Sequence, residues 1–202
     1  MAAKAEANAM LERHVLIAGI PAVFWGPDSG RRILAVHDAG GNKQCTSIRA
    51  LASLAVPLGW QVVSFDLPGH GARRREWGAC LPRRCAEELR QLRDLLAPGH
   101  RLRLFAEGLG AQWAVLAFQN TALERALLLS PAVGPGLPLT RWDTPTAILS
   151  TPESTGCAFG TAGDFARRWN CSFMHADSTG TARRQFIERW LKCPAPYDRL
   201  DA

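Results

Sequence analysis

Residues 102–112 read Leu-Arg-Leu-Phe-Ala-Glu-Gly-Leu-Gly-Ala-Gln, an apolar run followed by a turn of small residues. This order predicts a buried strand that passes through a sharp turn into a helix. Turns of this kind carry a nucleophile at the apex of the pattern small-x-Ser-x-Gly, and the small residues let strand and helix approach closely. Gly108 stands at the apex here. The steric requirements of the turn are kept, while the hydroxyl that would do chemistry is missing.

The rest of the chain alternates apolar runs with segments of helical periodicity, which predicts a mainly parallel sheet covered by helices on both faces. The first two predicted strands are separated by a short turn and are expected to pair antiparallel. Strands are predicted at 14–18, 21–25, 33–36, 61–65, 101–105, 126–130, 146–150 and 171–175, and helices at 46–58, 85–96, 111–119, 164–169 and 182–191.

Length and composition fit one globular domain. The chain has 202 residues, of which 47% are hydrophobic and 21% charged, so we expect a single domain over 11–202 after a frayed tail at 1–10. Apolar stretches are too short to cross a bilayer, and the start of the chain lacks the apolar region of a signal peptide. We therefore expect a cytoplasmic protein without a membrane partner.

Cysteine spacing and charge argue against two classes of site. The six cysteines form no CxxC pair and no zinc-ligand pattern with the five histidines, so we expect reduced thiols, no metal and no cofactor. The net charge of +6 comes mostly from arginines, with local runs at 73–75, 83–84 and 183–184. Because no nucleic-acid-binding motif accompanies these runs, a solvated arginine face is a better interpretation than a nucleic-acid site.

Three motifs in a fixed order give the chain a family resemblance over nearly its whole length. They are His-Asp-Ala-Gly-Gly at 37–41, Phe-Asp-Leu-Pro-Gly-His-Gly at 65–71 and the turn at 106–110. Together they resemble the oxyanion loop, the Asp-x-Pro-Gly-x-Gly turn and the nucleophile elbow of the α/β-hydrolase superfamily. The chain looks most like small bacterial members. The resemblance implies a three-layer α/β fold with a mostly parallel sheet and an antiparallel N-terminal strand pair. It implies no cap domain, because the connection at 131–145 is short.

The same resemblance exposes departures from the superfamily's catalytic triad, which runs nucleophile, acid, histidine along the chain. Gly108 is a vacant nucleophile position. Glu153 is the carboxylate available after the strand at 146–150, and the loop at 176–181 contains no histidine. His175, at the end of the last predicted strand, is the nearest candidate base, although a structural role is the more common one for such a histidine. Asp177 is a second acid that could orient it.

The oxyanion loop is altered as well. The resemblance places the backbone donors of the hole at the amides of Leu109 and Ala39, but Asp38 replaces a glycine of that loop. A carboxylate that points into the hole would repel a developing oxyanion, whereas one that points to solvent would not. The short connection at 131–145 predicts a shallow, open cleft above Gly108, which suits a protein partner or a small-molecule ligand.

Other reactive or aromatic residues have plainer interpretations. A displaced nucleophile at Cys45 or Cys157 would need a neighbouring base or cation, and an ordinary loop thiol is favoured. We expect His37 and His70 to hold loops by hydrogen bonds. Tryptophans at helical positions are predicted in the core, whereas Trp77, beside Arg73, Arg74 and Arg75, is a candidate protein contact. The predicted core tryptophans are Trp113, Trp169 and Trp190.

Three functions follow from these residues. The leading hypothesis is an α/β-hydrolase-fold protein that has lost hydrolytic activity and acts as a binding, regulatory or scaffold protein. The alternative is a serine hydrolase, a carboxylesterase or thioesterase, in which a serine native to position 108 has been replaced by glycine. There, Glu153 or Asp177 would orient His175 and the Leu109 and Ala39 amides would form the oxyanion hole. The third is a non-hydrolytic member that uses a histidine base without a nucleophile.

Overall fold

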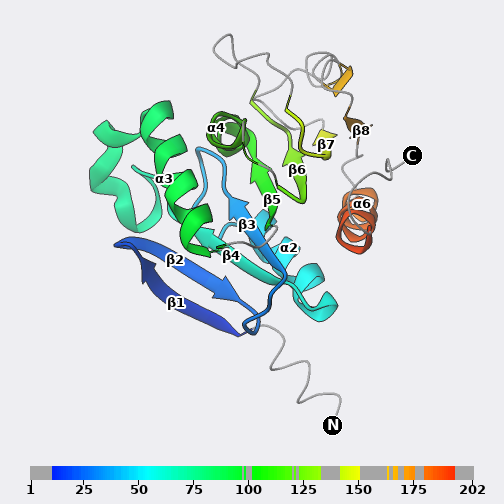
Figure 1. Ribbon diagram of the computed structural model, residues 1–202, viewed down its shortest axis with the longest axis horizontal. Coiled ribbons are helices and arrows are strands. Elements are labelled where there is room, and N and C mark those ends of the chain that lie inside the picture. Colours follow the sequence, from blue (N-terminus) through cyan, green and yellow to red (C-terminus); the bar gives the residue numbers. More distant parts are fainter. Residues whose placement is uncertain are drawn as a thin grey trace.

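A computed structural model describes residues 11–96, 98, 102–119, 121, 123–132, 142–150, 163, 166–167, 171–175 and 180–193. Over these ranges the strands form one sheet in the order β1-β2-β4-β3-β5-β6-β7-β8 (Figure 1). The strands are β1 Glu12–Ile17, β2 Ile20–Trp25, β3 Arg32–Val36, β4 Gln61–Phe65, β5 Leu102–Glu107, β6 Arg125–Leu129, β7 Thr146–Ser150 and β8 Ser172–His175.

Strand direction agrees with the sequence-based prediction. β1 pairs antiparallel with β2, and β2 pairs antiparallel with β4. All pairs from β4 through β3 and β5 to β8 are parallel. The expected mostly parallel sheet with an antiparallel N-terminal pair is therefore confirmed. Its carboxyl edge, where α/β proteins place their sites, brings together the ends of β3, β5, β6, β7 and β8.

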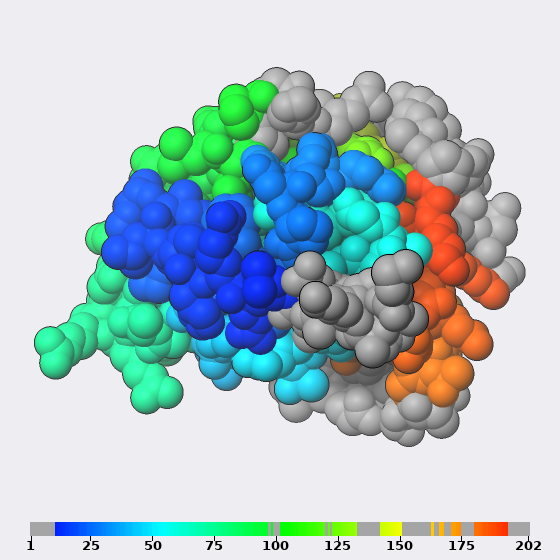
Figure 2. All heavy atoms as spheres, turned by 90° about the horizontal axis from the view of Figure 1, so that it is seen from below, coloured from blue at the N-terminus to red at the C-terminus, as the bar shows by residue number. Residues whose placement is uncertain are grey.

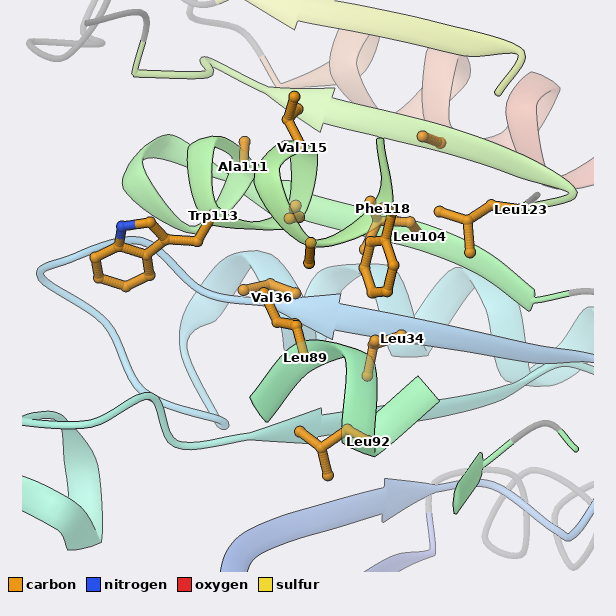
Figure 3. Packing of buried hydrophobic residues seen from close by; sticks show 14 of the residues in the cluster. Leu34, Val36, Leu89, Leu92, Leu104, Ala111, Trp113, Val115, Phe118 and Leu123 are labelled. Atoms are coloured by element: carbon orange, nitrogen blue, oxygen red, sulfur yellow. The ribbon is translucent and has the colours of Figure 1, made fainter. Parts of the chain in front are cut away.

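Helices cover both faces of the sheet and divide the core into two clusters. Leu89 and Leu92 of one helix and Phe118 of another pack with Leu34 and Leu104 of the sheet on the first face (Figure 3). On the second face a separate cluster includes buried residues from two further helices. The first face carries α3 (Pro82–Leu96) and α4 (Gly108–Phe118), and the second carries α2 (Thr46–Ala55), the 3-10 turn η1 (Val56–Leu58) and α6 (Thr181–Lys192).

Some element boundaries differ from the prediction. α3 begins at Pro82 rather than at Cys85, because proline is well suited to the first turn of a helix. α4 begins at Gly108 itself, so the turn has no separate loop. Most of the predicted helix at 164–169 lies outside the described residues; in this region only 163, 166 and 167 are described, and all three are helical. The predicted tail at 1–10 lies wholly outside the described residues.

One element was not predicted at all: the 3-10 segment η2 (Gly71–Ala79), which follows β4. The predicted core positions Trp113 and Trp190 are buried, whereas Trp77 on η2 is 67% exposed. Trp169 lies outside the described residues.

Among the described helices, none has the length and apolar character that crossing a membrane requires.

Candidate functional site

The strand-turn-helix around position 108 has the backbone of a nucleophile elbow. Gly108 has a φ of +53°, in the left-handed region that favours glycine. A Cβ on Gly110 would overlap the His37 carbonyl oxygen and lie 2.9 Å from Val36 Cγ1, so this glycine is needed for α4 to approach β3. The Ala132 amide donates to the Gly108 carbonyl at 2.9 Å. The predicted elbow is thus present, with its close packing intact.

The Asp38 carboxylate fills the space above this elbow. A Cβ built on Gly108 would collide with both carboxylate oxygens and the carboxylate carbon of Asp38. Asp38 Oδ1 accepts hydrogen bonds from the Leu109 amide at 2.7 Å and from the Ala39 amide at 2.7 Å. These are the two amides that the family resemblance assigns to the oxyanion hole. Of the two orientations that the sequence leaves open for Asp38, the structure has the one that points into the hole.

This arrangement binds an internal anion where the superfamily would bind a reaction intermediate. Two backbone N–H groups and the N-terminus of α4 favour negative charge at this point. An acyl substrate would need the same two donors for its developing oxyanion. As long as Asp38 Oδ1 accepts both bonds, the hole cannot stabilise a second negative oxygen.

The histidine of the oxyanion loop has a structural role. The Leu67 amide donates to His37 Nε2 at 3.1 Å, so Nδ1 carries the proton and donates to the Asp38 carbonyl at 2.6 Å. Burial lowers the pKa of His37 to about 4, only partly opposed by the hydrogen bond to Asp38. The neutral imidazole therefore ties the oxyanion loop to the turn after β4 from within the core.

His70 makes a second tie between the same segments. Its Nδ1 lies 2.8 Å from the Pro68 carbonyl oxygen and its Nε2 lies 2.5 Å from the Ala39 carbonyl oxygen. The ring is buried and lies next to the ring of His37, with 5.2 Å between centroids. Ala39 is thus held on its carbonyl side by His70 and on its amide side by Asp38. Both histidines occupy the loop-holding positions expected from the sequence.

Asp66 makes a third tie to the loop between β3 and α2, in addition to those of His37 and His70. Its carboxylate accepts from the Lys43 ammonium at 2.5 Å and from the Lys43 and Ala72 amides, each at 2.9 Å. Burial would raise the pKa of Asp66, but the Lys43 side chain and these amides outweigh it and hold the pKa below its usual range. The motif that contains Asp66 is evident from the sequence, but its partner is not, because Lys43 lies on a loop before α2.

A polar group beside the elbow was also missed by sequence reasoning. Glu107, the last residue of β5, accepts a hydrogen bond from the Ser47 hydroxyl, and Cys45 Sγ lies 3.2 Å from Ser47 Oγ. Burial raises the pKa of Glu107, opposed in part by the bond from Ser47. Ser47 lies in the first turn of α2, so the signal would have been a helix start that faces a strand end. Among the described residues, the side chain of Cys45 bonds to this hydroxyl and to no base or cation.

The remaining predicted site residues are only partly described. Strand register places His175 opposite Ser150 and Glu107 opposite Leu129. His175 is therefore level with position 108 but three strands away, about 14 Å at ordinary strand spacing. The structure does not describe the side chain of His175, nor Glu153, Cys157 and Asp177. The predicted open cleft depends on residues 133–141, which also lie outside the described residues. The catalytic roles predicted for His175 and Glu153 stay predictions.

No group of three or more histidine, cysteine, aspartate or glutamate side chains within the described ranges is placed to hold a metal ion. The five cysteines that the structure describes are free thiols.

Comparisons with known proteins give matches at the level of structure. No family model matches the chain, and no curated protein matches it by sequence. Dienelactone hydrolase from Anabaena variabilis superimposes with a TM-score of 0.74 at 15% identity, over 89% of this chain and 96% of that one. The esterase Est1E from Butyrivibrio proteoclasticus, with ferulic acid bound, gives 0.72 at 11% identity, over 89% and 97%.

A third similar structure is an alpha-beta serine hydrolase homologue from Coxiella burnetii, with a TM-score of 0.67 at 16% identity, over 90% of this chain and 95% of that one. Identities this low support the shared architecture and leave activity open. The elbow, the strand order and these superpositions agree: the chain has the α/β-hydrolase fold.

Proposed function

We propose that this chain acts by binding rather than by serine-type hydrolysis, and that its acyl-transfer site is occupied by its own Asp38 carboxylate. The observation that carries the proposal is the pair of 2.7 Å bonds from the Leu109 and Ala39 amides to Asp38 Oδ1. Gly108 supplies no nucleophile, and Asp38 takes the hydrogen-bond donors that a nucleophile would depend on. Two separate departures therefore oppose the same chemical step.

A second candidate function is supported by a different observation. The similar solved structures reported above are named as esterases and hydrolases, which favours hydrolysis over binding as the activity of the fold. The retained elbow backbone supports the same candidate, since φ at Gly108 and the packing of Gly110 are those a nucleophile turn needs. On this account the chain is a carboxylesterase or thioesterase whose native residue at 108 is serine.

The experiment compares four proteins: the unaltered chain, Gly108→Ser, Asp38→Ala and the variant with both substitutions. Each is treated with a fluorophosphonate probe and assayed for p-nitrophenyl acetate hydrolysis. We expect neither labelling nor turnover above background in the unaltered chain, which has no nucleophile at this position. We expect the same of Gly108→Ser, because a Cβ at 108 displaces the Asp38 carboxylate but leaves its negative charge beside the two amides, where it repels a developing oxyanion. Labelling of Gly108→Ser alone, or ester turnover by the chain as given, would contradict the proposal.

The double variant separates the two candidates further. Gain of labelling only when Asp38→Ala accompanies Gly108→Ser would identify Asp38 as the blocking group and indicate that a usable base survives. A single oxyanion-hole donor is worth about 10²–10³ in rate, so a functional hole would be readily detected. A double variant that stays inert, although Gly108→Ser supplies a nucleophile and Asp38→Ala frees the two amides, would indicate that the chain also lacks a working base.

A further inference from the structure

The segment from η2 to the first turn of α3 presents an exposed surface that the chemistry at position 108 does not use. In Figure 2 the blue-green part of the chain that contains η2 projects from one end of the molecule. Trp77 is 67% exposed and Leu81 is 59% exposed. Arg74, Arg75 and Arg83 are exposed as well. We call these five residues the Trp77 surface.

The charge of this surface is not balanced locally. Residues 71–84 contain five arginines and a single glutamate, Glu76. That glutamate is already engaged by Arg73 at 2.6 Å and by Arg84 at 3.8 Å. Among the described residues, none forms an ion pair with Arg74, Arg75 or Arg83. The Trp77 surface thus offers three guanidinium groups to a partner.

Buried contacts beneath the Trp77 surface fix its conformation. Arg73 is buried and bonds through its guanidinium to Glu76, Glu88 and the Asp66 carbonyl. Trp77 packs so closely over Gly69 that a Cβ there would lie 2.7 Å from Trp77 Cε3, and its ring lies 5.8 Å from that of His70. Because the indole is fixed at one edge and exposed at the other, binding a partner would cost little side-chain conformational entropy.

We propose that the Trp77 surface binds an acidic segment of a partner protein, in which carboxylates pair with the arginines and an apolar side chain packs on Trp77 and Leu81. Arginine and tryptophan are the residues most enriched at the energetic centres of protein interfaces. The guanidinium fork pairs bidentately with carboxylates. Three unpaired arginines are fewer than the four to eight cations typical of a lipid-binding cluster, which favours a protein over an anionic membrane. The inference does not depend on the function proposed for position 108.

The test uses the full chain and a short fluorescein-labelled peptide in which glutamate alternates with leucine. Its binding is followed by fluorescence anisotropy at low salt. We expect saturable binding that weakens about tenfold or more in Trp77→Ala and in the triple variant R74E/R75E/R83E. The matched controls are Leu16→Ala, which removes another exposed apolar side chain, and R13E/R90E/R93E, which reverses three arginines elsewhere. Both should bind as the unaltered chain does.

Three results would overturn the inference: no binding of the peptide, equal loss in the R74E/R75E/R83E and R13E/R90E/R93E variants, or binding to phosphatidylserine vesicles without binding to the peptide. Trp77→Ala removes packing against Gly69, so circular dichroism checks that it folds. The R74E/R75E/R83E variant changes only exposed, unpaired side chains and keeps the proposal testable if Trp77→Ala unfolds. Because the readout is peptide binding, it is unaffected by whether position 108 supports hydrolysis.

Discussion

At the scale of single residues, Gly108 and Asp38 are two halves of one feature. Glycine at 108 leaves the space that the Asp38 carboxylate fills, and the positive φ would strain any other residue there. In turn, Asp38 accepts from one of the free amides in the first turn of α4, that of Leu109. A side chain at 108 and a carboxylate at 38 are therefore mutually exclusive in this geometry.

This exclusion predicts a coupled pair of substitutions. Gly108→Ala should destabilise the chain by roughly 2–4 kcal/mol, from left-handed strain of about 1–2 kcal/mol and displacement of Asp38. In an Asp38→Ala background the same change should cost only the strain. Urea unfolding of the four proteins in the cycle measures the coupling, which we expect to be about 1–2 kcal/mol. Additive effects would mean that Asp38 does not occupy the space beside Gly108.

A second residue-scale prediction concerns pH. Because burial lowers the pKa of His37 from 6.5 to about 4, the unfolded chain takes up this proton at a higher pH than the folded chain. The contribution of His37 is complete above pH 6.5 and is lost as pH falls towards about 4, by about 3 kcal/mol in all. Urea unfolding at several pH values should show this loss. The loss of unfolding free energy between pH 6.5 and 4 should be smaller in His37→Asn and unchanged in a substitution of the exposed His14.

At the scale of elements, β5 leads into the elbow at its carboxyl end and contacts the C-terminus of α6 near its other end. Arg103 on β5 is buried and donates to Glu124 and to the carbonyls of Trp190, Leu191 and Cys193. Its guanidinium also lies 4.2 Å from the Trp60 ring centroid. The cation thus satisfies the free carbonyls at the C-terminus of α6, where positive charge is favoured.

Removing this cation should loosen the attachment of α6. Arg103→Met leaves Glu124 and three carbonyls without their donor, and breaking a buried pair in this way costs about 3–5 kcal/mol. We expect a correspondingly lower melting temperature. The control is Arg184→Met, which breaks an exposed Arg–Glu pair within α6 and should cost less than about 1 kcal/mol. Equal losses in the two variants would contradict the role assigned to Arg103.

Elements with a strong pattern could be predicted, and η2 shows why others could not. The continuous apolar run at 33–36 predicted β3, a strand that is buried on both faces, and the leucines at 89 and 92, one helical turn apart, predicted α3. Residues 71–79 are rich in arginine and have no such period. Arg73, at a kink in this segment, pairs with Glu88 on α3 at 2.7 Å, and this is a tertiary contact that local sequence does not record.

At the scale of the whole molecule, the order of three motifs was enough to predict the fold, and the superpositions agree with it. The site was predicted less completely. The sequence marked Gly108, Asp38, Ala39 and Leu109 as one constellation but left the direction of Asp38 open. Its orientation is set by an amide 71 positions further along the chain, which comes close only after β3 and β5 pair. The acid and base predicted at Glu153 and His175 stay predictions.

The most direct test of the occupied oxyanion hole is to follow the amide protons of Leu109 and Ala39 by NMR during an acid titration. Both donate to one oxygen of Asp38, so both resonances should shift together as that carboxylate is protonated. Both shifts should be absent in Asp38→Asn. Amides that respond independently of each other, or that titrate unchanged in Asp38→Asn, would contradict the account.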